Sequence, residues 1–233
     1  MEEIRRNIAA IRAKMDAAAR AAGRDPREIS LCAATKMNDA ARVKIAVQSG
    51  IDCCGENRVQ ELTAKLQDDA YSPLPVHFIG HLQTNKVRQV VGRVALIQSV
   101  DRLPLLQCIA QEAAKQGVIQ DILLEINVGA EDSKSGFSPD EADGIAAQMA
   151  NFPHCRLRGL MAIPPMAKKT GDNRRFFDKI RTIAVDIISK KYDNTHMDCL
   201  SMGMTDDFED AIACGSTMIR VGTAIFGART YNK

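Results

Sequence analysis

The sequence contains no tryptophan, few aromatic residues and no apolar run that approaches the ~18 residues of a membrane-spanning helix. It also lacks an excess of either charge, since 31 Lys and Arg residues nearly balance 29 Asp and Glu residues and leave a net charge of +2. Such a balance gives no basic surface for nucleic acid or for an anionic membrane. The N-terminal segment lacks the apolar core of a signal peptide. We therefore expect a cytoplasmic protein that binds neither nucleic acid nor membrane.

The seven cysteines show no C-x-x-C pattern, and their number is odd. Most lie inside apolar stretches, which is typical of buried thiols in a reduced compartment. Cys53 and Cys54 are adjacent, but a disulfide between neighbours is strained and no other ligand flanks them, so we interpret them as small residues that end a strand. His196 and Cys199 would point to opposite faces of a strand, so no metal site is predicted. His77, between two apolar residues, is expected to be a satisfied barrel residue rather than a base.

What the chain has instead is an alternation of short apolar runs and helix-periodic stretches over 233 residues. The runs are continuous, which is typical of parallel strands that are buried on both faces. Eight strands are predicted, at Ile29–Thr35, Ile51–Cys54, Val76–Ile79, Ala95–Val100, Ile122–Val128, Leu157–Met161, Met197–Ser201 and Met218–Val221. Eight βα units in about 200 residues predict an α/β fold, a single (β/α)8 TIM-type barrel over residues 1–233. A doubly wound open sheet is the alternative.

Several helices can be placed from their end signals. An amphipathic helix precedes the first strand and stops at Gly23, and we expect it to pack on the barrel of a monomer rather than on a partner subunit. Residues 138–141, Ser-Pro-Asp-Glu, form a capping box with proline at the first helical position, which predicts a helix that opens there. Further helices are predicted around residues 85–91 and from residue 207 to Gly215.

The functional residues of such a barrel lie at the C-terminal ends of its strands. Two segments at these ends combine a hydroxyl with a glycine, and they are Ser201-Met202-Gly203 and Arg220-Val221-Gly222-Thr223. Barrels often bind phosphate at the loops after strands seven and eight, and backbone N–H groups reach phosphate oxygens closely where side chains are small. We therefore predict a phosphate site there. Met161 closes the sixth strand on the same face.

Lys36 follows the first predicted strand, where its side chain would point into the mouth of the barrel. Desolvation of an amine lowers its pKa and makes it nucleophilic, so Lys36 could form a Schiff base with a carbonyl. A phosphate site opposite such a lysine suggests an aldehyde that carries a phosphate, pyridoxal 5′-phosphate. A sugar-phosphate enzyme, which has no use for the lysine, is an alternative on these residues alone.

A series of longer segments occurs in the order of a known family. They are Ala33–Lys36, Gly55–Asn57, Val59–Glu61, His77–Gly80, Leu82–Lys86, Ser133–Gly136, Leu157–Met161, Leu200–Met204 and Gly215–Thr223. Over nearly the whole chain they resemble the pyridoxal-phosphate homeostasis proteins of the YggS type, which are similar in fold to the N-terminal barrel of alanine racemase. The resemblance implies a protein that binds pyridoxal phosphate, takes part in vitamin B6 homeostasis as a carrier or buffer for apo-forms of pyridoxal-phosphate enzymes, and affects amino-acid and keto-acid balance.

The resemblance also implies roles for residues at the strand ends. Lys36 would be the Schiff-base lysine, Asn57 would lie near the cofactor ring, and Arg220 would face the pyridine nitrogen. The phosphate would be held by Ser201, Gly222 and Thr223. Met161 and Met202, at the same strand ends, complete the predicted cofactor contacts.

Arg220 makes carbanion chemistry at such a site less favourable, although the resemblance implies that racemases of this fold tolerate such an arginine. A guanidinium beside the ring nitrogen disfavours its protonation, which makes the bound cofactor a poorer electron sink. A racemase of this fold also needs a second base, and none of the tyrosines Tyr71, Tyr192 and Tyr231 lies at a strand end near the predicted site. We therefore predict a cofactor-holding protein rather than an enzyme. The alternative is a low-efficiency amino-acid racemase, with His81 or a cysteine as second base.

Three residues depart from the family pattern. Asn38 stands where a second lysine is common, His81 where proline is common, and Cys54 where phenylalanine is frequent. The first departure removes an amine that would accept or pass on the cofactor. Lys86 and Lys134 are then the candidate secondary amines.

Overall fold

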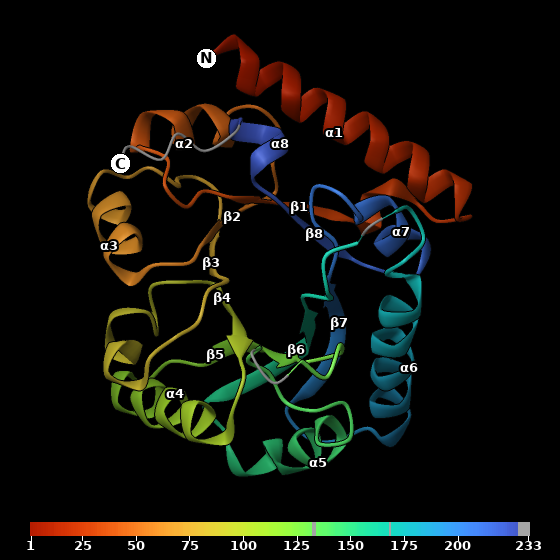
Figure 1. Ribbon diagram of the computed structural model, residues 1–233. Coiled ribbons are helices and arrows are strands. Elements are labelled where there is room, and N and C mark those ends of the chain that lie inside the picture. Colours follow the sequence, from red (N-terminus) through yellow and green to blue (C-terminus); the bar gives the residue numbers. More distant parts are fainter. Residues whose placement is uncertain (132–133, 168, 228–233) are drawn as a thin grey trace.

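The predicted strands close into a parallel barrel (Figure 1). The computed structural model describes residues 1–131, 134–167 and 169–227. Within them, strands β1 to β8 are Ser30–Ala34, Cys53–Glu56, Val76–Phe78, Leu96–Val100, Gln120–Ile126, Cys155–Ala162, Thr195–Ser201 and Met218–Val221. Each strand pairs with the next, and β1 pairs with β8. This closure confirms the (β/α)8 barrel and contradicts the open sheet, while the extent of one domain over residues 1–233 stays a prediction.

The strands lie close to their predicted positions because most of them are buried by the barrel on one side and by helices on the other, whereas the first five residues of β7 are half-buried or exposed. Every residue of β4 is buried, as expected of a strand covered on both faces. Strands β5 and β7 begin two residues before the predicted starts, at Gln120 and Thr195, because polar residues at the N-terminal ends give no apolar signal. Cys53 and Cys54 open β2 and do not end it, so that prediction was wrong.

Helices surround the barrel on its outer side (Figure 1). The α-helices α1 to α8 are Glu2–Ala21, Ala40–Val47, Val59–Gln67, Leu103–Gln116, Ala142–Ala147, Arg174–Lys190, Phe208–Ala213 and Thr223–Phe226. Short 3-10 helices η1 to η3 are Pro26–Glu28, Thr84–Gln89 and Gln148–Asn151. The helix predicted around residues 85–91 is therefore η2, a single 3-10 segment.

The helix predicted to open at Ser138 begins four residues later, at Ala142. The Glu141 carboxylate accepts a hydrogen bond from the Ser138 N–H at 2.8 Å, which is one half of a capping box. The other half is missing, because Ser138 Oγ donates to the same carboxylate at 2.8 Å and the N–H of Glu141 donates to the carbonyl of Ser138. These contacts close a turn, and α5 follows it.

The N-terminal helix α1 packs against α2, α7 and α8, so the chain's own barrel covers its apolar stripe. Its buried residues are Ile4, Ile8, Ile11, Met15 and Ala19. This confirms the expected packing on the barrel, whereas the monomeric state stays a prediction. Among the helices that the structure describes, none has both the length and the apolar character of a membrane span.

Candidate functional site

A cavity opens at the C-terminal ends of the strands, on the face where the site is predicted. Its volume is about 520 Å³, which lies within the ~300–1,000 Å³ of small-molecule sites. The loops after every strand except β4 contribute to its lining. Five of the predicted cofactor residues line it, and they are Lys36, Asn57, Arg220, Gly222 and Thr223.

Glu125, on β5, is a half-buried carboxyl in this lining that the sequence analysis missed. Burial raises its pKa to about 7, and repulsion from Asp101 acts in the same direction, while Arg220 opposes both. A glutamate inside a predicted strand gives no signal by itself. Only its inward direction in the closed barrel reveals it.

The lining carries a net positive charge near neutral pH. Lys36 and Arg220 are cations, and Lys134 is ion-paired with a neighbouring glutamate. Asp206 is the opposing carboxylate, and Glu125 is only partly ionised near its pKa of about 7. The cavity therefore favours an anionic ligand such as a phosphate.

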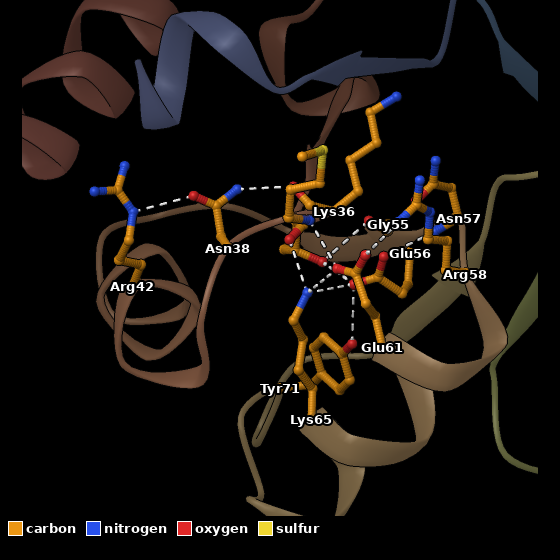
Figure 2. Close-up of polar contacts among 12 residues, drawn as sticks. Lys36, Asn38, Arg42, Gly55, Glu56, Asn57, Arg58, Glu61, Lys65 and Tyr71 are labelled. Carbon is orange, nitrogen blue, oxygen red and sulfur yellow. Dashed lines mark hydrogen bonds and ion pairs between the residues drawn. The ribbon is translucent and has the colours of Figure 1, made fainter. Parts of the chain in front are cut away.

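Two side chains of α3, Lys65 and Glu61, bind the residues on either side of Lys36 in the chain (Figure 2). Lys65 Nζ, on α3, donates to the Thr35 carbonyl at 2.9 Å. The Met37 N–H donates to the Glu61 carboxylate at 2.7 Å, and Met37 has a φ of 59°, a left-handed conformation that is uncommon for such a side chain. The Lys36 side chain itself extends away from this cluster, into the cavity lining.

Glu56, at the end of β2, is the centre of this cluster, and its side chain is 0% exposed. It accepts hydrogen bonds from Lys65 Nζ at 2.7 Å, Thr35 Oγ1 at 3.1 Å and the Tyr71 hydroxyl at 3.4 Å. Its second oxygen accepts from the N–H of Asn57 at 2.9 Å. Burial raises the pKa of Tyr71, so this hydroxyl is a donor and not a base. One carboxylate therefore holds the loops of both Lys36 and Asn57.

The sequence analysis missed Lys65, although a signal for it was present. Glu61 and Lys65 are four residues apart on α3, a spacing that places them together on one helix face, and their charged groups are 3.1 Å apart. Such a pair is usually solvated, which is why the pattern gave no reason to expect a buried cluster.

Asn38, the departure from the family pattern, ties the Lys36 loop to α2. Its Nδ2 donates to the Lys36 carbonyl at 3.0 Å, and Arg42 Nε donates to Asn38 Oδ1 at 3.0 Å (Figure 2). An amide can both donate and accept here, so the residue at 38 stabilises the loop.

Asn57 lines the cavity and carries a buried side-chain oxygen that lacks a hydrogen-bond partner among the described residues. Within residues 1–131, 134–167 and 169–227, its Oδ1 is the one buried side-chain oxygen or nitrogen without a hydrogen-bond partner. Its backbone is approached closely by Gly80, where a Cβ would lie 2.4 Å from the Asn57 carbonyl oxygen. A buried acceptor of this kind costs free energy unless a ligand or water satisfies it.

Arg220, on β8, is held rigidly at the floor of the cavity. Its Nη1 donates to the carbonyl and to Oγ of Ser201, at 2.7 and 2.6 Å, and its Nη2 donates to the Ala162 carbonyl at 3.0 Å. Ser201 Oγ in turn donates to Gln98 Oε1 at 2.6 Å. Burial lowers the pKa of the Arg220 guanidinium.

Three predicted cofactor residues lie below the cavity and not in its lining. Ser201 is 0% exposed and supports Arg220. Met161 packs against Leu96 and other residues inside the barrel, and Met202 belongs to the main apolar core. Direct contact of these three with a cofactor stays a prediction.

Gly222 brings the end of β8 close to the end of β1. A Cβ at Gly222 would lie 3.3 Å from the Ala34 Cβ, which is tighter than most contacts of this kind. Ala34, Gly222 and Thr223 all line the cavity, so small residues do surround the predicted phosphate position.

Of the histidines and tyrosines considered as bases, only His81 lies in the described lining of the cavity. His77 is buried, its Nδ1 is 2.9 Å from Gln98 Nε2, and burial lowers its pKa to about 4, as expected of a satisfied barrel residue. His81 lines the cavity, with its Nδ1 3.0 Å from Asp101. Tyr71 and Tyr192 are not in the lining. Tyr231 and Ser133 lie outside the described residues.

Fold and cavity define a class: a (β/α)8 barrel domain with an anion-favouring site at the strand ends. The family model that describes the alanine racemase N-terminal domain matches residues 2–230. The chain is 42% identical over 236 residues to the pyridoxal phosphate homeostasis protein of Escherichia coli K12, covering 100% of both, and 39% identical over 231 residues to that of Pseudomonas aeruginosa, covering 99% of this chain and 98% of the relative. The chain belongs to the pyridoxal phosphate homeostasis protein family.

Solved structures agree with this membership. PipY of Synechococcus elongatus with pyridoxal phosphate bound is 30% identical, with a TM-score of 0.82 over 96% of this chain and 100% of that one. An alanine racemase of Clostridium difficile is 15% identical, with a TM-score of 0.73 over 100% of this chain and 58% of that one, a likeness of fold alone.

Removing the buried cation of the cluster is expected to destabilise the fold. Lys65→Met leaves the Glu56 carboxylate buried without its partner, which should lower the free energy of unfolding by about 3–5 kcal/mol. The measurement is urea unfolding. Lys115→Met, on the exposed side of α4, is the matched control and should change it by less than about 0.5 kcal/mol. Equal effects of Lys65→Met and Lys115→Met on the free energy of unfolding would contradict a stabilising role of the buried ion pair. The double variant Lys65→Met/Glu56→Gln should regain part of the free energy lost in Lys65→Met, because it no longer buries an unpaired charge.

Glu125 is expected to make stability fall as pH rises. Its folded pKa is about 7 against an ordinary value of 4.5, so between these values the folded chain holds a proton that the unfolded chain has released. The unfolding free energy therefore drops by roughly 2 kcal/mol across this window. Glu125→Gln should remove that drop, as measured by urea unfolding at about pH 5 and about pH 8. Glu112→Gln, on α4, is the control for loss of one carboxylate, and an unchanged drop in Glu125→Gln would refute the assignment.

Proposed function

We propose that this chain binds pyridoxal 5′-phosphate in the cavity at the strand ends, holds it covalently through Lys36, and acts as a carrier or buffer in intracellular homeostasis of the cofactor. The observation that carries the proposal is the juxtaposition of Lys36 with Arg220, Gly222 and Thr223 in one anion-favouring cavity. Two lines of support come from relatives: the curated ones are named for this cofactor, and the PipY structure is described with it bound.

The residues present fit the cofactor. When bound, pyridoxal phosphate supplies an aldehyde, which condenses with a primary amine and releases water. Lys36 supplies that amine from a loop that Glu61 and Lys65 keep in place. The cationic lining offsets the phosphate charge, and the small residues at Gly222 admit phosphate oxygens near the backbone. Asn57 Oδ1 offers its unpaired acceptor to a donor on the ligand.

The same residues support holding over catalysis. Ser201 and Ala162 fix the Arg220 guanidinium, so it cannot turn away from a ring nitrogen placed beside it. A fixed cation there disfavours protonation of that nitrogen and weakens carbanion stabilisation. We therefore propose a non-catalytic, cytoplasmic monomer that passes the cofactor to apo-enzymes through the open mouth of the barrel.

Low-efficiency amino-acid racemisation is the second candidate function. One observation favours it: His81 lines the cavity and its Nδ1 lies 3.0 Å from Asp101 Oδ2, the arrangement of an oriented imidazole base. A carrier needs no base at this position.

Lys36→Ala is expected to abolish covalent retention of the cofactor. Wild-type protein mixed with pyridoxal phosphate should show a visible absorption band, and borohydride should reduce it to a stable label on Lys36, located by peptide mass spectrometry. The Ala variant should lose both, because the other lysine of the described lining, Lys134, is held in an ion pair with Glu131. Lys115→Ala is the control for a surface lysine. A label spread over surface lysines, or one found on Lys134, would contradict the proposal.

Exchange of the amino-acid α-proton separates the two candidate functions. The loaded protein in heavy water should exchange α-protons no faster than free cofactor in buffer, because the site lacks a good electron sink. Faster exchange that His81→Gln abolishes would establish the racemase instead. Proton NMR of the amino acid measures both outcomes.

A further inference from the structure

The interior of the barrel, below the cavity, is unusually rich in sulfur. Barrels normally fill this space with branched aliphatic side chains. Here β1, β2 and β3 bring together Cys32, Cys53 and His77, whose ligand atoms all lie within 4.8 Å of one another. All three residues are buried, with exposed fractions of 0%, 2% and 7%. Two thiols and an imidazole at this separation are a combination of ligands that proteins use to bind zinc.

The strand register produces this cluster. Cys32 and Cys53 are direct partners across the β1–β2 ladder. His77 pairs with Gly55, two residues beyond Cys53 on the same face of β2. The absence of a side chain at Gly55 leaves space for the Cys32 sulfur, because a Cβ at Gly55 would lie 2.9 Å from Cys32 Sγ. Cys199 packs against the small apolar cluster that Cys32 and Cys53 form with Met218.

We propose that Cys32, Cys53 and His77 form a binding site for one thiophilic divalent cation, Zn²⁺. Zinc takes sulfur and nitrogen ligands in a tetrahedron, with Zn–S distances of about 2.3 Å, so its two sulfurs lie about 3.8 Å apart. Ligand atoms that are already within 4.8 Å need only small side-chain movements to reach this geometry. The fourth ligand position falls to water.

Charge favours the complex in this buried place. Zinc displaces the two thiol protons, which leave to solvent, and two thiolates with one Zn²⁺ and a neutral imidazole carry no net charge. A neutral complex suits a low-dielectric interior far better than free thiolates would. Because both thiols give up their protons to bind the ion, its uptake should release protons and strengthen with pH.

His77 reaches the hydrogen-bonding state of a metal-bound histidine after one rearrangement of its neighbour Gln98. Its Nδ1 lies 2.9 Å from the Gln98 amide, which leaves Nε2 for the ion. Binding at Nε2 requires the tautomer with a proton on Nδ1, and a half-turn of the Gln98 amide presents its oxygen to that proton. The sequence gave no hint of the site because its ligands come from three strands and follow no local spacing.

The experiment is metal binding by the full-length, reduced protein without cofactor, so the outcome is independent of the proposed function. Zn²⁺ is titrated in competition with a chromophoric chelator, and Co²⁺ serves as a probe because thiolate ligands give it a charge-transfer band. We expect one ion per chain, release of two protons, and a cobalt–thiolate band. Protein from zinc-supplemented cells, analysed for metal, covers the case in which the ion enters only during folding.

Variants decide whether the ion lies at these residues. Cys53→Ala and, separately, His77→Gln should weaken binding at least about 100-fold. Cys54→Ala is the matched control, because Cys54 is the next residue on β2 but packs in the main core on the other face, and it should bind as the wild type does. The proposal is overturned if neither preparation of the wild type holds a stoichiometric ion. It is also overturned if Cys53→Ala and His77→Gln, each shown to be folded by circular dichroism, bind as tightly as the wild type.

Discussion

The burial of the Glu56 carboxylate at the end of β2 constrains the site more than any other contact. A charge without solvent contact must be balanced and fully hydrogen-bonded, and Lys65 supplies the balancing charge. Lys65 also donates to the Thr35 carbonyl. If Lys65 moved away, both the Glu56 carboxylate and this carbonyl would lose their partner inside the protein. The position of the solvent-facing Lys36 therefore depends on an ion pair that lies wholly beneath it.

This arrangement separates rigidity from access. The base of the Lys36 loop is fixed at Thr35 and Met37, and Met37 keeps an uncommon left-handed backbone that the Glu61 contact compensates. The mouth above it is bordered by partly exposed apolar side chains, Ile163 and Met204 among them. A site that holds a reactive aldehyde and also releases it needs both properties: a lysine presented in one place, and an opening through which the ligand passes.

The sequence predicted the barrel well because burial on both faces leaves a continuous apolar signal in most strands, although β7 carries it only near its end. It predicted less about the elements at the strand ends, where a single contact decides the outcome, as the turn closed by Ser138 and Glu141 shows. Lys36 and Gly222 could be found from position alone. Lys65 could not, since a lysine on an amphipathic helix is usually solvated and only the tertiary fold places a buried carboxylate above it.

The sequence also could not predict whether a residue at a strand end lines the cavity or lies below it. Ser201 is the last residue of β7, so its position predicted a place in the cavity lining. In a closed barrel the strands are staggered, and inward side chains from alternate strands form layers. Arg220 from β8 extends over Ser201 and binds its hydroxyl, which puts the serine one layer down. Strand order and stagger, and not residue type, decide which of the two faces a ligand.

The layers are nevertheless joined by one line of hydrogen bonds. It runs from Arg220 through Ser201 Oγ and the Gln98 amide to the imidazole of His77. The Gln98 amide has one donor end and one acceptor end, so its two neighbours cannot change their hydrogen-bonding roles independently. A change of tautomer at His77 therefore reorients the Gln98 amide and, through it, the Ser201 hydroxyl. Arg220 keeps its bonds to the carbonyls of Ser201 and Ala162. The floor of the cavity thus keeps its charge fixed while the orientation of one hydroxyl beneath it depends on the interior of the barrel.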